Sequence, residues 1–270
     1  MHGSTPLNRP FPLPYDIVEM VIAHLTHDLS DLKACSLTCR SWYTATVQHL
    51  HYTITLVRNK PDIGNNRLEP LSTLHELGLL SLVKAIRLLE WPATGYWFVS
   101  PAFNRATLRP FSALTNVHTL KLQYMEVYRC MPDVEPHFGH FSQTLRSITL
   151  YQPRGTSRQL SHFLSYFSNL DDIGIRNPLT RVSNTIVPDP ELIPRSAPKL
   201  RGRLALYSST SVEICTDLIT SCGGLRFRHM DLCWSESCAP VLLEACAETL
   251  ETLRLGGMMY DSGSEWFRTG

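Results

Sequence analysis

Cysteines are the side chains best suited to chemistry in this 270-residue sequence, which contains eight of them. Five follow one another toward the C-terminus, where thiolates could bind a metal ion or carry a thioester. A structural zinc site requires paired Cys-x-x-Cys spacing, which these five lack, and nothing around them marks a reactive thiol. We therefore interpret the cysteines as buried apolar thiols and predict no metal site and no cofactor. The five are Cys215, Cys222, Cys233, Cys238 and Cys246.

Motifs of common enzymes are also missing from the sequence. It contains no Gly-x-Ser-x-Gly nucleophile elbow, no Gly-x-x-x-x-Gly-Lys-Ser/Thr phosphate loop and no His-Glu-x-x-His zinc helix. The eleven histidines are scattered without a cluster. We predict a protein without catalytic residues; a thiol enzyme with one fast-alkylating cysteine is the weaker alternative.

Composition and charge restrict the partners and the compartment. A content of 43% hydrophobic and 18% charged residues is typical of a folded globular protein. The formal net charge of +1 provides no field for nucleic acid or anionic lipid, so we predict neither as a partner. Lys84 and Arg87 interrupt the most apolar stretch, which excludes a membrane helix there. Because Met1–Pro12 carries prolines instead of the apolar core of a secretory signal, we predict a cytoplasmic and/or nuclear protein.

A loop-like segment, Pro61–Pro70, divides the sequence into a short N-terminal part and a longer C-terminal part. The N-terminal part shows apolar spacing typical of three short helices, and Asp28 or Ser30 can cap the second of them. These helices are predicted over Pro14–Leu25, about Ser30–Cys39 and Trp42–Leu50.

Beyond this loop, strand-like runs recur on the template apolar-x-x-apolar-x-apolar. The template alone is too loose to prove a repeat, but successive copies end 23 to 34 residues apart, close to the period of leucine-rich repeats. Helix-like segments separate several copies, at Gln159–Phe167, Val212–Ser221 and Pro240–Cys246. The seven copies end at Leu88, Leu122, Leu150, Ile175, Leu206, Leu232 and Leu255.

This region, about Val83 to Gly257, resembles an irregular leucine-rich repeat protein, although the asparagine or cysteine that usually closes each repeat is mostly missing. The resemblance implies stacked strand-and-helix units that share one core in a curved solenoid. An unrelated α/β domain is the alternative. The proline-broken stretch Arg176–Pro198 is either an insertion between repeats or a sign against them.

Residues that alternate with the apolar positions of the strands point away from the core. Five of these are basic and two are acidic, which favours an acidic or phosphorylated target segment; a solvated mixed surface is the alternative. Four aromatic residues in one loop, Trp91, Tyr96, Trp97 and Phe98, form either another binding rim or a loop that packs its own side chains. The candidate substrate-binding residues are Arg87, Lys121, Tyr151, Arg176, Arg203, Tyr207 and Arg254.

The first predicted helix is apolar over a wide arc. At about 100° per residue, its apolar side chains span roughly 200°, whereas packing on a single core needs a stripe only a little over 100° wide. A unit of about 40 residues is too small to cover both sides, so we expect a partner protein to complete it.

The residues of this region also resemble the F-box motif. The pattern is Leu13-Pro14-x-Asp16-Ile17, then Ile22 and Leu25, then Leu32-x-x-Cys35-Ser36-Leu37-x-Cys39-Arg40-x-Trp42. The resemblance implies a three-helix module that docks on the Skp adaptor of a Skp–cullin–F-box ubiquitin ligase. It implies adaptor contacts at Leu13, Pro14, Ile17, Leu32, Cys39 and Trp42, whereas Val21, Leu25 and Leu37 would hold the helices together. Tyr15 and Thr38 depart from the usual motif, which leaves the affinity for the adaptor open.

The two resemblances together predict an α+β fold, with an N-terminal three-helix F-box module followed by an irregular α/β leucine-rich-repeat solenoid. The predicted function is a non-catalytic substrate-recognition subunit of the ligase, bound to the Skp adaptor and through it to cullin, with an unknown target protein on the repeats. A non-ligase interaction scaffold is the alternative, and adaptor affinity separates the two. The predicted parts are a flexible tail (1–12), the F-box module (13–50), a connecting strand, loop and helix (51–82), the repeat domain (83–258) and a C-terminal tail (259–270).

Overall fold

The computed structural model describes residues 13–26, 28–58, 69–90, 111–127, 138–178, 200–207, 212–221, 224–233 and 237–256. The chain forms two compact units that separate after Tyr52. We call the described residues 13–52 the helical unit and the described residues from Thr53 onward the sheet unit.

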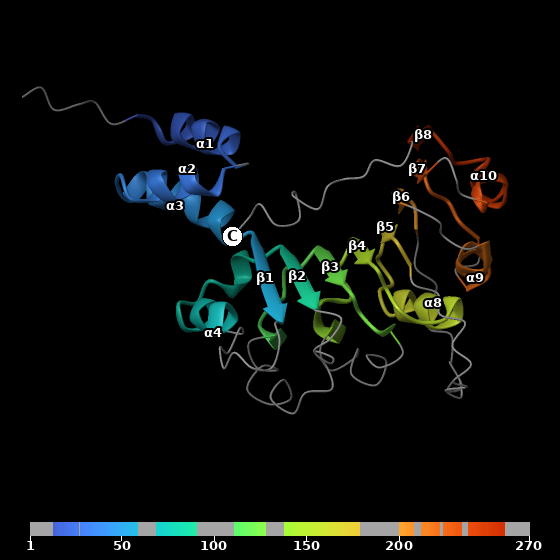
Figure 1. Cartoon of the computed structure of the whole chain (residues 1–270). Coiled ribbons are helices and arrows are strands. Elements are labelled where there is room, and N and C mark those ends of the chain that lie inside the picture. The colour runs from blue at the N-terminus through green and yellow to red at the C-terminus, as the bar shows by residue number, and fades with distance from the viewer. Residues whose placement is uncertain are drawn as a thin grey trace, which may run out of the picture. The chain divides into compact units, whose positions relative to one another are not determined.

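Three helices make up the helical unit, close to the three predicted segments (Figure 1). They are α1 (Tyr15–His24), α2 (Leu29–Ser36) and α3 (Arg40–Leu50). Pro14 directly precedes α1, where its missing N–H costs no helical hydrogen bond. Asp28, one of the two predicted candidates, is the N-cap of α2: its carboxylate accepts the backbone N–H groups of Ser30 at 2.8 Å and Asp31 at 3.1 Å.

The core of the helical unit is small. Its buried apolar residues are Val18, Ile22, Leu32 and Ala45. Val18 and Ile22 lie four residues apart on one side of α1, so only this side of the helix faces the core. Partly buried residues complete the packing, namely Leu25, Cys35, Trp42 and Leu50.

One parallel sheet organises the sheet unit. Its eight described strands follow one another in chain order, and each pairs in parallel with the next (Figure 1). The strands are β1 (Thr53–Arg58), β2 (Ala85–Glu90), β3 (Thr119–Gln123), β4 (Ser147–Tyr151), β5 (Asp172–Arg176), β6 (Arg203–Tyr207), β7 (His229–Cys233) and β8 (Thr252–Gly256).

The register of the sheet is uniform. Each strand-like run predicted from the apolar template forms a strand, and equivalent apolar positions lie opposite each other, as Leu120 does with Ile86 and Ile148. This row continues through Ile173, Leu204, Met230 and Leu253. The unequal intervals between the copies therefore lie outside the strands.

The predicted fold class is wrong. The described residues form one eight-stranded, all-parallel sheet with helices, an α/β arrangement, and not an α+β arrangement of an F-box module followed by an irregular solenoid. The sheet also begins one strand before the predicted repeats, because β1 pairs with β2 over its whole length. The unequal spacing of the apolar runs suggested irregular repeats, but parallel pairing depends on the strands alone and tolerates connections of different length.

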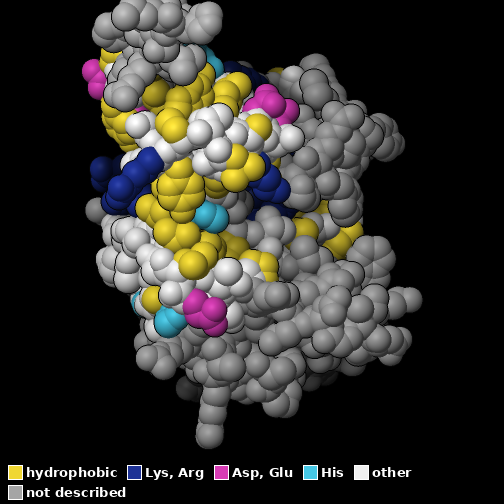
Figure 2. Space-filling model, turned by 90° about the vertical axis from the view of Figure 1, so that its left-hand side faces the viewer, with side chains coloured by type: hydrophobic (Ala, Val, Ile, Leu, Met, Phe, Trp, Pro, Cys, Tyr) yellow, Lys and Arg dark blue, Asp and Glu magenta, His cyan; other side chains and the backbone are white. Residues whose placement is uncertain are grey.

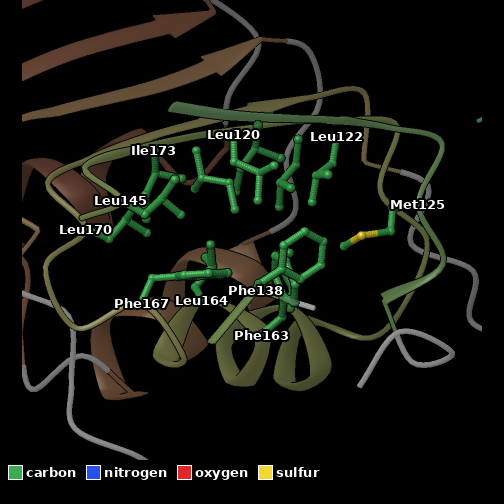
Figure 3. Close-up of a cluster of buried hydrophobic side chains, with 14 of the residues drawn as sticks. Leu120, Leu122, Met125, Phe138, Leu145, Phe163, Leu164, Phe167, Leu170 and Ile173 are labelled. Atoms are coloured by element: carbon green, nitrogen blue, oxygen red, sulfur yellow. The ribbon is translucent and has the colours of Figure 1, made fainter. Parts of the chain in front are cut away.

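Helices supply the other side of the core in the sheet unit. Leu71 and Leu74 of α4, together with Phe163 of α8, belong to the same buried cluster as the strands. In Figure 3, Leu120 and Leu122 of β3 point toward Phe163 and other side chains beneath the sheet. These helices are α4 (Glu69–Glu76), α8 (Ser157–Ser165), α9 (Val212–Ser221) and α10 (Ala239–Cys246), with short 3₁₀ helices η1 (Leu80–Leu82) and η4 (Gly139–Phe141).

Local signals fix where α8 begins. Thr156 and Gln159 form a capping box, in which the Thr156 hydroxyl accepts the Gln159 N–H at 3.2 Å and the Gln159 side chain accepts the Thr156 N–H at 3.0 Å. This start turns Leu160, Phe163 and Leu164 toward the core. Over the described part of the chain, none of the helices has both the length and the apolar character needed to cross a membrane.

Candidate protein-binding surfaces

Large apolar side chains are concentrated on the surface of the helical unit. Among the described residues, only three exposed large hydrophobic side chains lie elsewhere, Leu77, Leu253 and Leu255. Figure 2 views the molecule from the side of α1–α3 in Figure 1 and shows hydrophobic side chains gathered on this face. The exposed large hydrophobic residues of the helical unit are Leu13, Tyr15, Ile17, Met20, Val21, Leu37, Tyr43 and Tyr52.

The α1 helix explains much of this exposure. Ile17, Met20 and Val21 lie side by side at helical spacing, next to the side of the helix that carries Val18 and Ile22 into the core. Met20 is 60% exposed, and Leu13, one turn before Ile17, is 55% exposed. The apolar arc is therefore wider than the core beneath it, as the sequence predicted. We call Leu13, Ile17, Met20 and Val21 the apolar surface of α1.

The predicted adaptor contacts divide into accessible and buried residues. Leu13, Pro14, Ile17 and Cys39 are exposed. Trp42 is half-buried and packs against the core of the helical unit.

Leu32 corrects the prediction, because it is only 1% exposed and lies in the core, where an adaptor cannot contact it. Leu37 is 86% exposed and Val21 is exposed, although both were expected to hold the helices together; Leu25 is partly buried, as expected. Leu32 and Leu37 are five residues apart, so they project from different sides of α2 and its C-terminus. The order of the motif does not reveal which of these sides faces the core.

Cys39 has a property that the sequence interpretation missed. It occupies the N-cap of α3, where the nearby backbone N–H groups of Trp42 and, less strongly, of Ser41 lower the pKa of the thiol. The helix N-terminus favours a thiolate in the same way. The sequence predicted this helix to begin at Trp42, so the position of Cys39 directly before a helix was not recognised.

The sheet unit presents a second candidate surface. The strand residues that alternate with the core positions form what we call the polar face of the sheet, and all the predicted substrate-binding residues belong to it. Lys121 lies opposite Arg87 of the neighbouring strand, and Arg176 lies opposite Tyr151. Tyr151 also makes an edge-to-face contact with Tyr124, with ring centroids 5.9 Å apart.

Electrostatic coupling joins three of the basic residues. Partial burial lowers the pKa of the Lys121 amine, and the positive charges of Arg87 and Arg176 lower it further. Lys121 itself is exposed, although its neighbours remove part of the water from its ammonium group. Arg87 is 8% exposed, and burial lowers the pKa of its guanidinium. The structure therefore brings Arg87, Lys121 and Arg176 together.

The polar face carries three further predicted residues, Arg203, Arg254 and Tyr207. Arg203 of β6 forms an ion pair with Asp231, with Nε 2.6 Å from the carboxylate, so its charge is compensated. Asp172 accepts the backbone N–H of Arg203 at 2.7 Å. Arg254 of β8 is exposed and lies opposite Asp231. Tyr207 belongs to β6, but its side chain lies outside the described part of the structure.

The cysteines show no metal chemistry in the described residues. Cys215, Cys233, Cys238 and Cys246 are buried, and burial raises the pKa of the Cys246 thiol. No three His, Cys, Asp or Glu side chains of the described ranges come together as metal ligands would. Cys222 and the aromatic loop residues Trp91, Tyr96, Trp97 and Phe98 lie outside the described residues.

Comparison with known proteins adds no relative to these observations. No protein-family model matches the sequence, and no curated protein matches it. The resemblances to the F-box motif and to leucine-rich repeats therefore stay predictions.

Proposed function

We propose that this chain is a substrate-recognition subunit of a Skp–cullin–F-box ubiquitin ligase. The helical unit binds a Skp adaptor, and through it a cullin, while the sheet unit holds the target protein. A separate conjugating enzyme carries out ubiquitin transfer, which is accelerated because target and enzyme are held close together. The chain itself contributes no catalytic residue.

The observation that carries this proposal is the apolar surface of α1. A core of four buried residues cannot also cover Leu13, Ile17, Met20 and Val21, and Leu37 adds a further exposed apolar side chain. Complete burial of one such side chain contributes about 1.5–3 kcal/mol. Exposed apolar groups gathered in this way are typical of a protein-interaction site.

The F-box resemblance supplies the identity of the partner. Four of its expected contacts, Leu13, Pro14, Ile17 and Cys39, are exposed at the surface of the helical unit. Trp42 is half-buried, so a partner would contact only part of its ring. The residues that supply apolar area thus overlap with those that the motif assigns to the adaptor.

Calorimetric titration of the full chain with a purified Skp adaptor tests the proposal. We expect binding near or below micromolar Kd for the parent chain. The triple variant Leu13→Ala/Ile17→Ala/Met20→Ala should bind at least ~100-fold more weakly, equivalent to about 2.8 kcal/mol. All three side chains are exposed, so the variant should keep its helix content.

Leu77→Ala is the matched control, because Leu77 is an equally exposed leucine of the sheet unit. It should bind the adaptor as the parent does. If the folded parent chain produced no binding heat, the ligase role would fail and the non-ligase scaffold would replace it. If Leu77→Ala and the triple variant weakened binding equally, the apolar surface of α1 would not be the docking site.

A further inference from the structure

The two edges of the sheet differ in how well they are covered. At one edge, Ile54 and Leu56 of β1 are buried, and side chains of α4 belong to the same buried cluster. At the other edge, every residue of β8 is exposed, and Leu253 and Leu255 are 38% and 49% exposed. Among the described residues, none pairs with β8 on its outer side (Figure 1). We call this outer side the β8 edge.

Backbone hydrogen-bonding groups of β8 point outward along this edge. Thr252 donates its N–H to the carbonyl oxygen of Arg228 on the β7 side, at 3.0 Å. In a parallel sheet, successive residues direct their N–H and C=O groups to alternate sides of the strand. The N–H and C=O groups of Leu253 and Leu255 consequently point away from β7. Such a row of backbone groups is a template on which another strand can pair.

The side chains of the β8 edge determine where an added strand must be apolar. Two apolar rows of the core end at Leu253 and Leu255, which lie opposite the buried Met230 and Leu232 of β7. Residues directly opposite each other on paired strands point to the same face of the sheet. A strand that continues both rows therefore has two apolar residues, two positions apart, against Leu253 and Leu255. Pairing would bury the apolar surface that both leucines expose.

Charge determines the residue between these two apolar positions. Arg254 lies between the two leucines on the polar face and is exposed. Neighbouring carboxylates pair with other arginines, Asp231 with Arg203 and Glu251 with Arg228. An opposite charge directly across from Arg254 would stabilise a strand pair, whereas a like charge would destabilise it. The residue that faces Arg254 in an added strand is therefore acidic.

Symmetric pairing of two copies of this chain does not fit the β8 edge. In an antiparallel pair of β8 strands, the register that places Leu253 against Leu255 also places Arg254 against its own copy, two like charges. Registers centred on Leu253 or on Leu255 place the other leucine against Glu251 or Gly257, which would leave it poorly covered. A segment of another protein meets the requirements of this edge better than a second copy does.

We propose that the β8 edge binds an extended segment of another protein, which adds to the sheet as a further strand. The segment has the pattern apolar-acidic-apolar, with its apolar residues against Leu253 and Leu255 and its acidic residue against Arg254. Both strand directions satisfy this pattern, because it is symmetrical. The site lies in the sheet unit, whereas the proposed adaptor site lies in the helical unit. The inference therefore goes beyond the proposed function and does not depend on it.

Fluorescence anisotropy of labelled peptide pools with the full chain tests the proposal. The first pool carries a central Ile-Glu-Ile in random flanks, and the second carries Ile-Lys-Ile in the same flanks. The third carries Ile-Glu-Ile with N-methylated backbone amides, which cannot donate hydrogen bonds to a strand. We expect the first pool to bind at least ~5-fold more tightly than either of the others, because the second opposes Arg254 with a like charge and the third cannot pair.

Variants of the chain locate the site. Arg254→Glu should reverse the preference, so that the Ile-Lys-Ile pool binds more tightly than the Ile-Glu-Ile pool. Arg201→Glu, at an exposed arginine two residues before β6, is the matched control and should keep the preference of the parent. Leu253→Ser/Leu255→Ser should weaken binding of the Ile-Glu-Ile pool at least ~10-fold, whereas Leu77→Ser, at an exposed leucine outside β8, should leave it unchanged. Thermal unfolding verifies that each variant is folded.

Hydrogen exchange shows directly whether a strand adds at the β8 edge. The amides of Leu253 and Leu255 should exchange rapidly in the free chain and at least ~10-fold more slowly with a single tight-binding peptide from the Ile-Glu-Ile pool. The amide of Thr252 is the internal control, because it already donates to Arg228 and should change less.

Four results would overturn the proposal. Absent or equal binding of the three pools would show that the β8 edge does not select a strand, and an unchanged preference in Arg254→Glu would place the acidic contact elsewhere. Slow exchange of Leu253 and Leu255 in the free monomer would show that residues of this chain already occupy the edge. The same slow exchange with the mass of a dimer or larger assembly, measured by light scattering, would assign the edge to a second copy. These measurements do not involve the Skp adaptor, so their failure would leave the proposed function standing.

Discussion

The helical unit and the sheet unit differ in how far they bury their apolar side chains. In the sheet unit, each row of apolar strand residues from β2 to β7 is buried against the next strand and the helices beneath it (Figure 3). In the helical unit, four residues form the core and twice as many large apolar side chains are exposed in the described part. The sheet unit is therefore stabilised by its own core, whereas the helical unit retains apolar area for a partner.

The burial of apolar strand residues changes at the β8 edge of the sheet. Leu255 of β8 lies opposite Leu232 of β7, yet Leu232 is buried and Leu255 is exposed. Both residues occupy the same template position in sequence. At the other edge of the sheet, Ile54 and Leu56 of β1 are buried, so burial of an apolar strand residue in this unit does not follow from residue type alone.

The largest expected effect is at the centre of the sheet core. Phe163 is fully buried and packs edge-on against Phe167, with centroids 5.4 Å apart. Phe163→Ala should lower the free energy of unfolding of the sheet unit by about 3–5 kcal/mol, because it removes buried surface and leaves a cavity. Denaturant unfolding followed by hydrogen exchange of α8 and its neighbouring strands measures this loss. A loss below 1 kcal/mol would show that the core of the sheet unit is loosely packed.

A matched pair of leucines tests the helical unit. Leu32→Ala removes one of four core residues and should destabilise this unit by roughly 2–3 kcal/mol. Leu37→Ala, on a side chain that is almost fully exposed, should change stability by less than about 0.5 kcal/mol. Hydrogen exchange of the α1–α3 amides measures both, with the sheet amides as the internal reference. Equal losses from the two variants would contradict the division between core and surface proposed here.

For binding of the Skp adaptor, we expect Leu37→Ala to have a larger direct effect than Leu32→Ala, the opposite of their order for stability. Leu37 is accessible and Leu32 is not. Calorimetric titration should therefore show a lower affinity for the Skp adaptor in Leu37→Ala, while that variant stays fully folded. This result would separate a residue of α2 that stabilises the unit, Leu32, from a residue at the C-cap of α2 that contacts the partner, Leu37. Unchanged affinity would limit the docking surface to α1.

The smallest expected effect is a pH dependence of the helical unit. Burial lowers the pKa of His51 from its ordinary value of 6.5, so the unfolded chain binds this proton more readily than the folded chain. The contribution of His51 to stability is therefore fully present above pH 6.5 and is lost as the pH falls through the interval down to the lowered pKa. Hydrogen exchange of α3 at pH 7.5 and pH 5 should show this loss in the parent and a smaller one in His51→Gln. The same loss in both proteins would assign the pH dependence to other groups.

Local patterns in the sequence predicted the elements well. The last two positions of each apolar triplet from Val83 to Leu255 lie in a strand, the helices at Val212–Ser221 and Pro240–Cys246 are in place, and Asp28 caps α2. These features depend on neighbouring residues only, through periodicity and capping. The fold class was wrong because it depends on how the strands pair. No pattern in the sequence indicated that β1 pairs with β2, so β1 was not assigned to the sheet.

The candidate surfaces were only partly predictable for a related reason. The sequence by itself determined the wide apolar arc of α1 and the alternation that puts Arg87, Lys121 and Arg176 on one face, since both follow from the period of a helix or strand. Only the tertiary structure decided that Leu32 is core and Leu37 is surface, that Arg203 pairs with Asp231, and that Lys121 lies opposite Arg87. These distinctions depend on contacts between residues far apart in the chain, which periodicity does not encode.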